Sequence, residues 1–518
     1  MTSQGPLRQT ARRYLLWCAN EHIEFRIPEI KSISSMFNIP LTWIDKPKED
    51  PYLIVEMNEG DARRLMSRCM LVRSCYELWG QGDTEEELHS SVKSFPLDMM
   101  KPHLASGKTY KVRVETFNRT LKSSEKLEKI ESLSYLPFEG KVDLTHATTC
   151  LHFLEYYGLH PNEIPCAPYK LFLGRWVVDG QRELINKFSL KTRTYIGNTS
   201  MDAQLSFIMA NFAQVQPASI AVDPFVGTGS VLVSAAQFGA HVWGWDIDYL
   251  TLHARTKPTR HSQKQRTAQE SIMSNLEQYG LRHRYLDVVV MDNARPFWRE
   301  VPYVDAIITD PPYGIRETTE RVGILKEPKN SENATRQQSS LEHFPTKITY
   351  SLSDAFCDLI NFAAGHLIVG GRLVFWLPVF REDYDESHIP SHPCLTLVFN
   401  CEQVLTVHSS RRLITLMKTR HPEVGETAKS QVTDVTAKFR DKFFQANALT
   451  KEERASMKSL FPRDKRGQGL GYRLEERINK SKPIKTEGTQ EHKSSEVMKR
   501  NSETADEERD VQISENHQ

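Results

Sequence analysis

Hydrophobic and polar positions along residues 13–79 follow two different periods. Apolar runs typical of strands and spacings typical of amphipathic helices succeed one another in the order strand, helix, strand, strand, helix, strand. The order predicts a small ferredoxin-like α/β domain over residues 1–80, with the role of a scaffold or a dimerisation module. The predicted elements are strands at 13–19, 40–43, 52–57 and 71–78, and helices at 24–37 and 61–68.

Residues 81–180 form a second predicted unit, of α+β type. Thr84 with Glu87 three residues later has the pattern of a capping box at the start of a helix. Basic side chains alternate here with aromatic ones, which could track an RNA backbone but could equally form a solvated face. The other predicted elements are a strand at 110–117, a helix at 124–133 and a turn into a strand at 138–144, and the basic residues are Lys108, Lys111, Arg113, Arg119, Lys122, Lys126, Lys129 and Lys141.

From residue 190 onward, short buried strands alternate with helices. This alternation predicts an α/β fold with a Rossmann-like, doubly wound sheet of seven strands over residues 181–425. The strands are predicted at 220–223, 241–246, 286–291, 304–309, 370–377, 401–406 and 413–417, and the helices at 203–213, 231–238, 272–279 and 352–367.

Composition adds two polar segments to this outline. The chain has 518 residues, 39% hydrophobic and 26% charged, which indicates a globular protein of two to four domains. Its net charge of +1 neither favours nor excludes a nucleic-acid partner. Residues 315–350 are expected to form either a mobile substrate loop or an idle surface loop. Residues 426–518 are rich in mixed charge and are predicted to be mostly disordered.

The eight cysteines lie apart from one another, without a Cys-x-x-Cys pair or a Cys/His cluster. This distribution predicts reduced thiols and no metal site within the chain. No stretch approaches eighteen consecutive apolar residues, and the N-terminal apolar run is too short for a signal peptide. We therefore expect a soluble cytosolic or nuclear protein that does not enter a membrane, and of the two compartments we predict the cytoplasm.

A predicted buried strand at 304–309 ends in Asp310-Pro311-Pro312-Tyr313-Gly314. The two prolines fix the path of the chain, and Gly314 lets it turn away. A carboxylate, the free Pro311 carbonyl and an aromatic ring are thereby held in one small space. The two oxygens can each accept one N–H of an exocyclic amine, while Tyr313 stacks on the nucleobase. A plain proline-rich turn is the competing interpretation of this motif.

A second strand, at 220–223, leads into the glycine-rich turn Asp223-Pro-Phe-Val-Gly-Thr-Gly-Ser230. Its glycines allow a close backbone approach to a ligand, and the following helix offers free N–H donors. No lysine is present for a P-loop, and Leu232 stands where a dinucleotide fingerprint has its third glycine. Asp223 favours a cationic ligand, such as the ammonium group of an amino acid.

Two more strand ends carry acids. Asp246 follows the second strand, where an acid accepts hydrogen bonds from both ribose hydroxyls, and Asp292 with Asn293 follows the third, where it could receive an adenine amine. Each acid alone could be an ordinary exposed carboxylate. Ammonium, ribose and adenine acceptors at successive strand ends together predict a site for S-adenosylmethionine.

With these motifs in place, the chain resembles the family of eukaryotic tRNA guanosine-10 N2-methyltransferases. The likeness is closest from Arg193 to Thr419, over Thr194–Met201, Asp223–Ser230, Gly244–Asp248 and Asp310–Gly314. It implies a class I S-adenosylmethionine-dependent methyltransferase domain preceded by a ferredoxin-like and a THUMP RNA-binding region. It also implies tRNA as a partner, and a small zinc-binding activator subunit that adds to an exposed sheet edge. An apolar strand near Leu232–Trp243 is the candidate edge.

The resemblance also assigns roles to individual residues. It implies that Asp310, Pro311, Pro312 and Tyr313 position the acceptor amine. It further implies cofactor binding by Thr199, Ser200, Asp223, Phe225, Gly227, Thr228, Gly229, Asp246, Ile247, Asp292 and Asn293. Trp245 departs from the family pattern, in which smaller residues commonly precede the ribose acid.

Three other acceptors fit the same chemistry: adenine N6 of DNA, guanine N2 of ribosomal RNA, and a glutamine amide of a protein. The N-terminal region argues against the first and the last, because a DNA enzyme would more often carry a target-recognition domain and a glutamine enzyme needs no basic extension. A non-catalytic RNA-binding subunit is the alternative from a different class. The intact Asp310 and the glycines argue against it.

Overall fold

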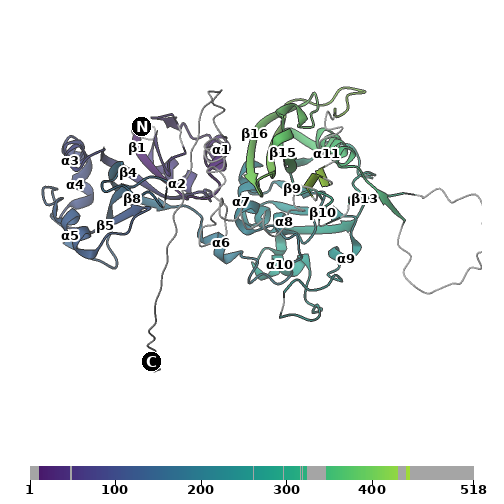
Figure 1. Ribbon diagram of the computed structural model, residues 1–518, viewed down its shortest axis with the longest axis horizontal. Coiled ribbons are helices and arrows are strands. Elements are labelled where there is room, and N and C mark those ends of the chain that lie inside the picture. Colours follow the sequence, from purple (N-terminus) through teal and green to yellow (C-terminus); the bar gives the residue numbers. More distant parts are fainter. Residues whose placement is uncertain are drawn as a thin grey trace, which may run out of the picture. The chain divides into compact units, whose positions relative to one another are not determined.

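The computed structural model describes residues 11–46, 49–160, 162–260, 262–295, 297–315, 317, 319–323, 346–429, 439–440 and 442–443 (Figure 1). None of the helices in these segments is long and apolar enough to cross a membrane. Most of the predicted disordered tail and most of the predicted substrate loop lie outside the described residues, although Phe439, in the described part of the tail, is buried. Of that loop, a short antiparallel pair is described, formed by β13 (Glu320–Val322) and β14 (Lys347–Thr349).

The N-terminal region is built on one eight-stranded sheet in the order β2-β3-β1-β4-β8-β7-β5-β6. Neighbours pair antiparallel, except that β5 pairs parallel with both β7 and β6. The strands are β1 (Arg12–Cys18), β2 (Thr42–Trp43), β3 (Tyr52–Met57), β4 (Val72–Gly82), β5 (Thr109–Phe117), β6 (Lys141–Val142), β7 (Thr149–Tyr156) and β8 (Lys170–Asp179).

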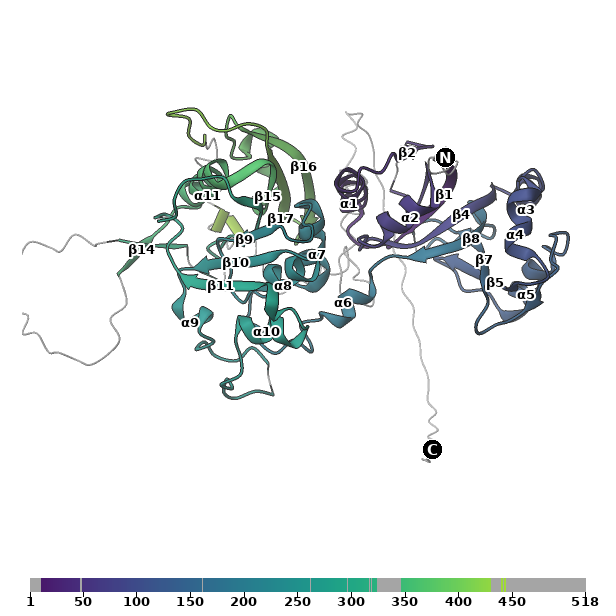
Figure 2. The same ribbon diagram turned by 180° about the vertical axis from the view of Figure 1, so that it is seen from behind.

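Five helices accompany this sheet, and Figure 2 shows them from behind. Side chains of α1 and α2 bury against β1, β3 and β4, those of α3 and α4 bury against β5, β7 and β8, and the partly buried Ile130 of α5 packs on the same cluster. Asn58 caps α2 by accepting from the Asp61 N–H, so this helix starts two residues before the predicted position. The helices are α1 (Ile23–Met36), α2 (Glu59–Met66), α3 (Glu85–Lys93), α4 (Leu97–Leu104) and α5 (Ser123–Glu131).

The element order predicted for residues 13–79 is confirmed, as are the helix after Thr84 and the strand at 110–117. Sequence reasoning did not identify β7, β8 or α4. Since β4 pairs with β8 from Ser74 to Gly82, the two predicted N-terminal units share a single sheet. The boundaries drawn between them at residues 80 and 81 stay a prediction.

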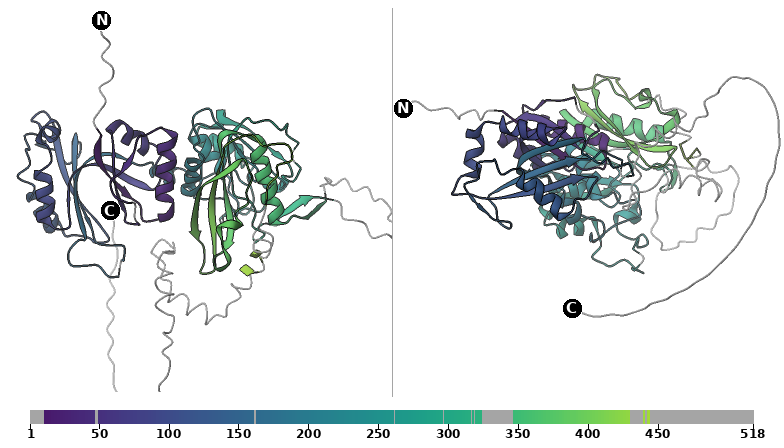
Figure 3. Two further views of the ribbon diagram at one scale, coloured as in Figure 1. Left: turned by 90° about the horizontal axis from the view of Figure 1, so that it is seen from above. Right: turned by 60° about the vertical axis from the view of Figure 1, so that its left-hand side comes forward.

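The second region is the predicted seven-stranded sheet, in the order β11-β10-β9-β12-β15-β17-β16. Six of the strands run in the same direction, and β17, between β15 and β16, runs antiparallel to both of its neighbours. The strands are β9 (Ile220–Asp223), β10 (His241–Asp246), β11 (Tyr285–Val290), β12 (Val304–Thr309), β15 (Leu367–Phe380), β16 (Leu395–Val404) and β17 (Ser409–Lys418), the last three of which are drawn in green in Figure 3. The α/β, Rossmann-like fold class is therefore confirmed.

Helices cover both faces of this sheet. One core joins α7 (Ala203–Phe212), α8 (Ser230–Gln237) and α10 (Ile272–Gln278) to the sheet, and a second joins α11 (Leu352–His366) to the other face. The short helices α6 (Glu183–Lys187) and α9 (Tyr249–Leu252) lie in the connections. Trp245 is fully buried against the α11 side, 5.1 Å from Phe362 between ring centroids, so the bulky residue before Asp246 fills the core.

The candidate partner strand near Leu232–Trp243 is wrong. Leu232 is a buried residue of helix α8, and β10 pairs on both sides, with β9 and with β11. The edge position at this end of the sheet belongs to β11, and the side chains of Leu286 and Val290 on it are 55% and 46% exposed.

Candidate active site

The four predicted strand-end acids gather at one edge of the parallel sheet. Asp223 and Asp246 are the last residues of β9 and β10, Asp310 directly follows β12, and Asp292 follows β11. These four strands are neighbours in the order β11-β10-β9-β12, and the carboxyl ends of parallel neighbours meet at the same edge. The fold thus brings together side chains that are separated by up to 87 positions (223 to 310) in the sequence.

Asp223 is buried at the centre of this edge. Its Oδ1 accepts from Thr309 Oγ1 at 2.6 Å and from the Phe225 N–H at 3.0 Å. The pKa of Asp223 is raised to about 7, chiefly by burial, with a smaller contribution from the carboxylates of Asp246 and Asp310, while the two hydrogen bonds oppose the rise. A cation that entered here would favour the ionised acid.

The glycine turn after β9 wraps around Asp246. Gly227 has a φ of 48°, and its N–H donates to Asp246 Oδ2 at 2.9 Å, while the Asp248 N–H donates to Oδ1 at 2.9 Å. A Cβ built on Gly227 would meet nothing within 4 Å, so open space adjoins the turn. Burial raises the pKa of Asp246 to about 6. Gly229 caps α8 with a φ of 76°, and Ile247 is half-buried beside Asp246.

Asp292 and Asn293 are buried after β11 and differ in how they are paired. Asp292 accepts from the Ala294 N–H at 2.9 Å. It also accepts, at 2.8 Å, from the Val322 N–H, which belongs to the inserted segment 315–350 (the insertion). Both polar atoms of the Asn293 amide lack a hydrogen-bond partner among the described residues. Buried amides are normally paired, so this one is free to take a ligand.

The Asp310 motif is closed on itself. The Tyr313 hydroxyl donates to Asp310 Oδ1, and Arg411 Nη1 donates to Oδ2 at 3.3 Å. Pro311 is buried, while Pro312 and Tyr313 are half-buried. Burial raises the pKa of Asp310, whereas Arg411 and the Tyr313 hydrogen bond lower it. Asp310 therefore already accepts from a hydroxyl at the oxygen that the predicted amine would use.

The segment before α7 lies against the glycine turn. Ser200 Oγ is 2.6 Å from Thr228 Oγ1 and accepts from the Gly197 N–H at 2.8 Å. Thr199 is exposed, and its hydroxyl donates to Glu317 in the insertion. Ser200 and Thr228 are thus in contact, while the Thr199 hydroxyl faces Glu317, and the cofactor-binding role of all three stays a prediction.

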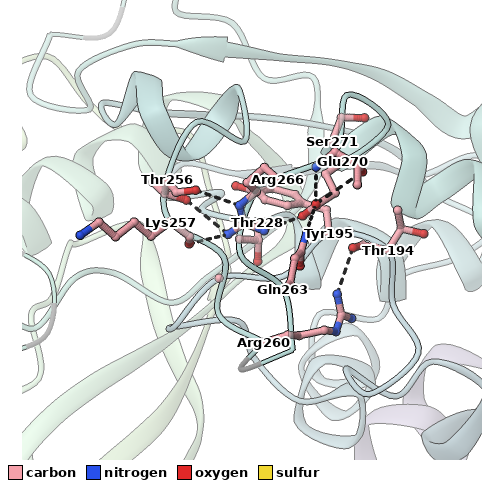
Figure 4. Close-up of polar contacts among 12 residues, drawn as sticks. Thr194, Tyr195, Thr228, Thr256, Lys257, Arg260, Gln263, Arg266, Glu270 and Ser271 are labelled. Atoms are coloured by element: carbon pink, nitrogen blue, oxygen red, sulfur yellow. Dashed lines mark hydrogen bonds and ion pairs between the residues drawn. The ribbon is translucent and has the colours of Figure 1, made fainter.

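A clamp that the sequence did not suggest holds this segment in place. Asn275 of α10 accepts from the Tyr195 N–H at 2.7 Å and donates to the Tyr195 carbonyl at 2.8 Å. Figure 4 shows the loop between α9 and α10 closing over Tyr195. There, Arg266 lies 4.9 Å from the Tyr195 ring, donates to the Thr256 carbonyl at 3.0 Å and pairs with Glu270 at 2.6 Å.

Sequence reasoning missed three side chains that touch the predicted site residues, and a fourth, Asn275, that holds Tyr195 ahead of them. Thr309 ends β12 and carried a local signal, since a hydroxyl just before Asp310 points to the same edge. The others come from distant segments without a recognisable motif, and they are Glu317, Asn275 and Arg411.

The basic residues of the N-terminal sheet divide into two groups. Lys129 pairs with Glu85 and Glu155, and Arg119 lies over Tyr157 and donates to the Cys166 carbonyl, so these two have structural partners. The side chains left at the surface belong to Lys108, Arg113, Lys122 and Lys141. Lys108 and Lys141 are adjacent, since the Lys141 N–H donates to the Lys108 carbonyl at 3.2 Å.

Two family models match successive parts of the chain. The family model of the Tmrp11 THUMP N-terminal domain matches residues 12–182, and that of the RMKL-like methyltransferase domain matches residues 191–327. Among solved structures, TrmN from Thermus thermophilus aligns over 79% of this chain and 100% of its own, with a TM-score of 0.36 and 16% identity.

Two curated relatives are closer. The tRNA (guanine(10)-N(2))-methyltransferase TRMT11 of Homo sapiens is 48% identical over 458 residues, which cover 86% of this chain and 98% of the human protein. The tRNA (guanine(10)-N(2))-methyltransferase of Saccharomyces cerevisiae is 34% identical over 415 residues, covering 78% and 92%. With a THUMP-type N-terminal domain, a methyltransferase domain and this identity over nearly their whole length, the chain belongs to the family of tRNA (guanine(10)-N(2))-methyltransferases.

Proposed function

We propose that the protein transfers a methyl group from S-adenosylmethionine to the exocyclic N2 amine of guanosine 10 in tRNA. The observation that carries the proposal is the gathering of Asp223, Asp246, Asp292 and Asp310 at one edge of the sheet. The first three suit a cofactor with an ammonium, a ribose and an adenine, and the fourth suits an amine acceptor. The names of the relatives supply the identity of the base.

The residues present fit S-adenosylmethionine. Open space adjoins Gly227, the Asn293 amide is unpaired among the described residues, and the pKa values of Asp223 and Asp246 are raised, so that a bound cation or hydroxyl donor would favour their ionised forms. Asp223 would hold the ammonium group, Asp246 the ribose hydroxyls, and Asp292 with Asn293 the adenine. Phe225, Ile247 and the Gly227–Gly229 turn would line the site, with Thr199, Ser200 and Thr228 above it. When bound, S-adenosylmethionine supplies an electrophilic methyl group.

Asp310 and the Pro311 carbonyl would position the acceptor amine. The lone pair of guanine N2 is delocalised into the ring, so the amine is a poor nucleophile. Two accepted hydrogen bonds, one by each oxygen, pull the nitrogen toward a tetrahedral shape and aim its lone pair. The amine loses its proton after transfer, when it is acidic, so no strong base is needed.

Tyr313 would change from a hydrogen-bond donor to Asp310 into a stacking partner of the base when the tRNA binds. Its hydroxyl now occupies Asp310 Oδ1, and an incoming amine N–H takes that place. The ring is then free to stack on the base, which helps to offset the cost of unstacking it from the tRNA stem, about a few kcal/mol.

A pair of variants separates the two halves of the site. We expect Asp310→Asn to lower kcat by at least about 100-fold because the amine is misplaced, while S-adenosylmethionine binding stays within twofold. Asp246→Asn should instead weaken S-adenosylmethionine binding first. Calorimetry with the cofactor and methyl transfer to total tRNA, ribosomal RNA and DNA are the measurements. Loss of cofactor binding in Asp310→Asn, or transfer to DNA or ribosomal RNA alone, would contradict the proposal.

A small zinc-binding activator subunit is part of the proposal, because the family resemblance implies one. Strand β11 supports it, since it stands at the sheet edge with Leu286 and Val290 exposed, and partners often add a strand to such an edge. We expect Leu286→Asp to abolish a heterodimer seen by size-exclusion chromatography. The control is Leu144→Asp, at a residue 75% exposed in the N-terminal sheet region. If both variants bind the activator equally well, its binding surface does not include Leu286 of β11.

We also place the protein in the cytoplasm. All eight cysteines are free thiols, and most are buried. Reduced thiols are typical of proteins that work in a reducing compartment. Imaging of the tagged full-length chain tests this placement.

A further inference from the structure

Arg411 is the residue outside the predicted motifs that touches the acceptor side of the site most directly. It lies on β17, opposite Pro378 of β15 and Gln403 of β16. Its guanidinium Nη1 is 3.3 Å from Asp310 Oδ2 and 3.4 Å from Tyr313 Oη. Within the part of the chain that the structure describes, it is the one cation that forms an ion pair with Asp310.

The guanidinium is held independently of Asp310. Arg411 Nε donates to Gln403 Oε1 at 2.7 Å, and the guanidinium carbon lies 4.0 Å from the ring centre of the fully buried Trp376. The Arg411 side chain is 14% exposed. Because a planar guanidinium stacked on an indole and fixed at Nε has few rotamers left, its Nη atoms point at the carboxylate before any substrate binds.

The surroundings of Asp310 show why its contact with Arg411 affects the protonation state of the acid. Asp310 faces Arg411 from β17, Tyr313 from its own loop, Asp223 from β9 and Glu317 from the insertion. Burial raises the pKa of Asp310 and so favours the protonated acid, which could no longer accept with both oxygens. Arg411 is the opposing charge, and it is itself faced by Asp202.

We propose that Arg411 is a positioning residue for the acceptor amine: it holds Asp310 Oδ2 and keeps the carboxylate ionised, so that Oδ1 is left to receive the amine N–H. This inference rests on the proposed methyl transfer. It adds that the antiparallel end of the sheet, β15 to β17, is part of the reaction's machinery through Arg411. When Tyr313 leaves Oδ1, its hydroxyl can remain the acceptor of the second Arg411 contact.

The neighbouring Arg412 provides a matched control. It lies on the same strand with a side chain 18% exposed, its guanidinium carbon is 4.0 Å from the Tyr384 ring centre, and it pairs with Glu402 at 3.8 Å. It differs from Arg411 in pointing to the other face of the sheet, away from Asp310. A purely structural arginine of this strand should therefore behave as Arg412 does.

The test uses the full chain, with its activator if activity requires one, and measures kcat and KM for tRNA from pH 5.5 to 9. We expect Arg411→Ala to lower kcat at pH 7 by about 10-fold to 100-fold, with S-adenosylmethionine binding within twofold. The acidic limb of its kcat profile should move up by about one pH unit, since the cation beside Asp310 is gone. Arg411→Lys keeps a positive charge but loses the planar set of guanidinium N–H donors. It should therefore lower kcat by only a few-fold and leave the acidic limb of the pH profile at its wild-type position.

Three outcomes decide the matter. A wild-type protein that methylates no tRNA would overturn the proposed function itself. A wild-type protein that does so, with Arg411→Ala and Arg412→Ala alike in kcat, pH profile and melting temperature, would leave Arg411 a structural residue and overturn this inference alone. If Arg411→Ala does not fold, Arg411→Lys decides, because a wild-type kcat in that variant is incompatible with the positioning role.

Discussion

At the scale of single residues, the site is a cluster of carboxyls, of which Asp223 and Asp292 are buried and Asp246 and Asp310 half-buried. Asp223 and Asp246 have pKa values raised to about 7 and about 6, chiefly by burial. The backbone N–H groups of Phe225, Gly227 and Asp248 oppose the rise but do not cancel it. A buried acid that is easily protonated when the site is empty, and ionised when a cation binds, couples ligand affinity to pH.

Asp223 should make cofactor binding depend on pH. Below a pH of about 7 the free protein holds this carboxyl protonated, so the ammonium of S-adenosylmethionine has no counter-charge. We expect the Kd to weaken about tenfold from pH 8 to pH 6, as for one group that titrates near the middle of that range. Calorimetry over this range measures the slope, which should flatten in Asp223→Asn. A wild-type Kd that does not vary with pH would contradict the assignment.

The raised pKa of Asp223 affects the stability of the cofactor-free protein in the opposite direction: cofactor affinity falls as the pH falls, whereas this contribution to stability falls as the pH rises. The folded pKa of Asp223 lies above its unfolded value of about 4, so the folded state binds the extra proton. This contribution is fully present below a pH of about 4 and is lost as the pH rises through about 7. Urea unfolding of wild type and Asp223→Asn, compared at pH 5.5 and pH 8.5, isolates it, because all other titrating groups are common to both.

At the scale of elements, the approach of β10 to β9 places two of the acids. A Cβ added to Gly244 of β10 would lie 2.4 Å from the Asp223 carbonyl oxygen, closer than real atoms approach. Only glycine lets these two strands run side by side at this point. The glycine that precedes Trp245 and Asp246 is therefore a packing requirement of the cofactor side.

We expect Gly244→Ala to lower the free energy of unfolding by about 1–3 kcal/mol, since β10 must move away from β9. S-adenosylmethionine binding should weaken as well, because Asp223 and Asp246 separate. Urea denaturation and calorimetry measure the two effects. Gly107→Ala is the matched control, since its added Cβ meets nothing within 4 Å and its φ is not positive. Equal stability of the two variants would show that β10 adjusts freely.

At the scale of the whole molecule, the chain joins two sheets, to which the proposed function assigns separate tasks. The parallel sheet carries the acids, and the N-terminal sheet carries the surface cations Lys108, Arg113, Lys122 and Lys141. Helix α1 of the N-terminal region packs on α7 of the other, where Asn211 donates to buried Glu29 at 2.8 Å and accepts from Arg68 at 3.1 Å. In the proposed function, the N-terminal region would hold the tRNA, and the target guanosine would reach the acids of the parallel sheet.

The double substitution Lys108→Glu with Lys141→Glu tests that division of tasks. We expect KM for tRNA to rise about tenfold with kcat unchanged, because only phosphate contacts are lost. The slope of log KM against log salt concentration should fall by about two. Lys31→Glu, on an exposed position of α1, is the control. A fall in kcat without a change in KM would place the RNA on another surface.

Local sequence was sufficient for the parallel strands and their acids. A buried strand followed by a glycine turn, or by Asp-Pro-Pro, needs no distant contact to be recognised, and β9, β10 and β12 were predicted to within a residue. The strands β7 and β8 were missed because both are buried throughout most of their length and lack a clear alternation of apolar and polar positions. Because β8 pairs with β4 and β7 joins β8 to β5, the single sheet of the N-terminal region could not be predicted without these two strands.

The sequence by itself determined the type of fold, the order of the parallel strands' functional groups and the chemistry that they suit, because each of these depends on a short run of neighbouring residues. Only the tertiary structure decided what surrounds those groups. Arg411 meets Asp310 across 101 positions because β17 pairs antiparallel with β15, which in turn lies beside β12. Such pairings depend on which buried faces fit together, and no local pattern of apolar and polar residues specifies that.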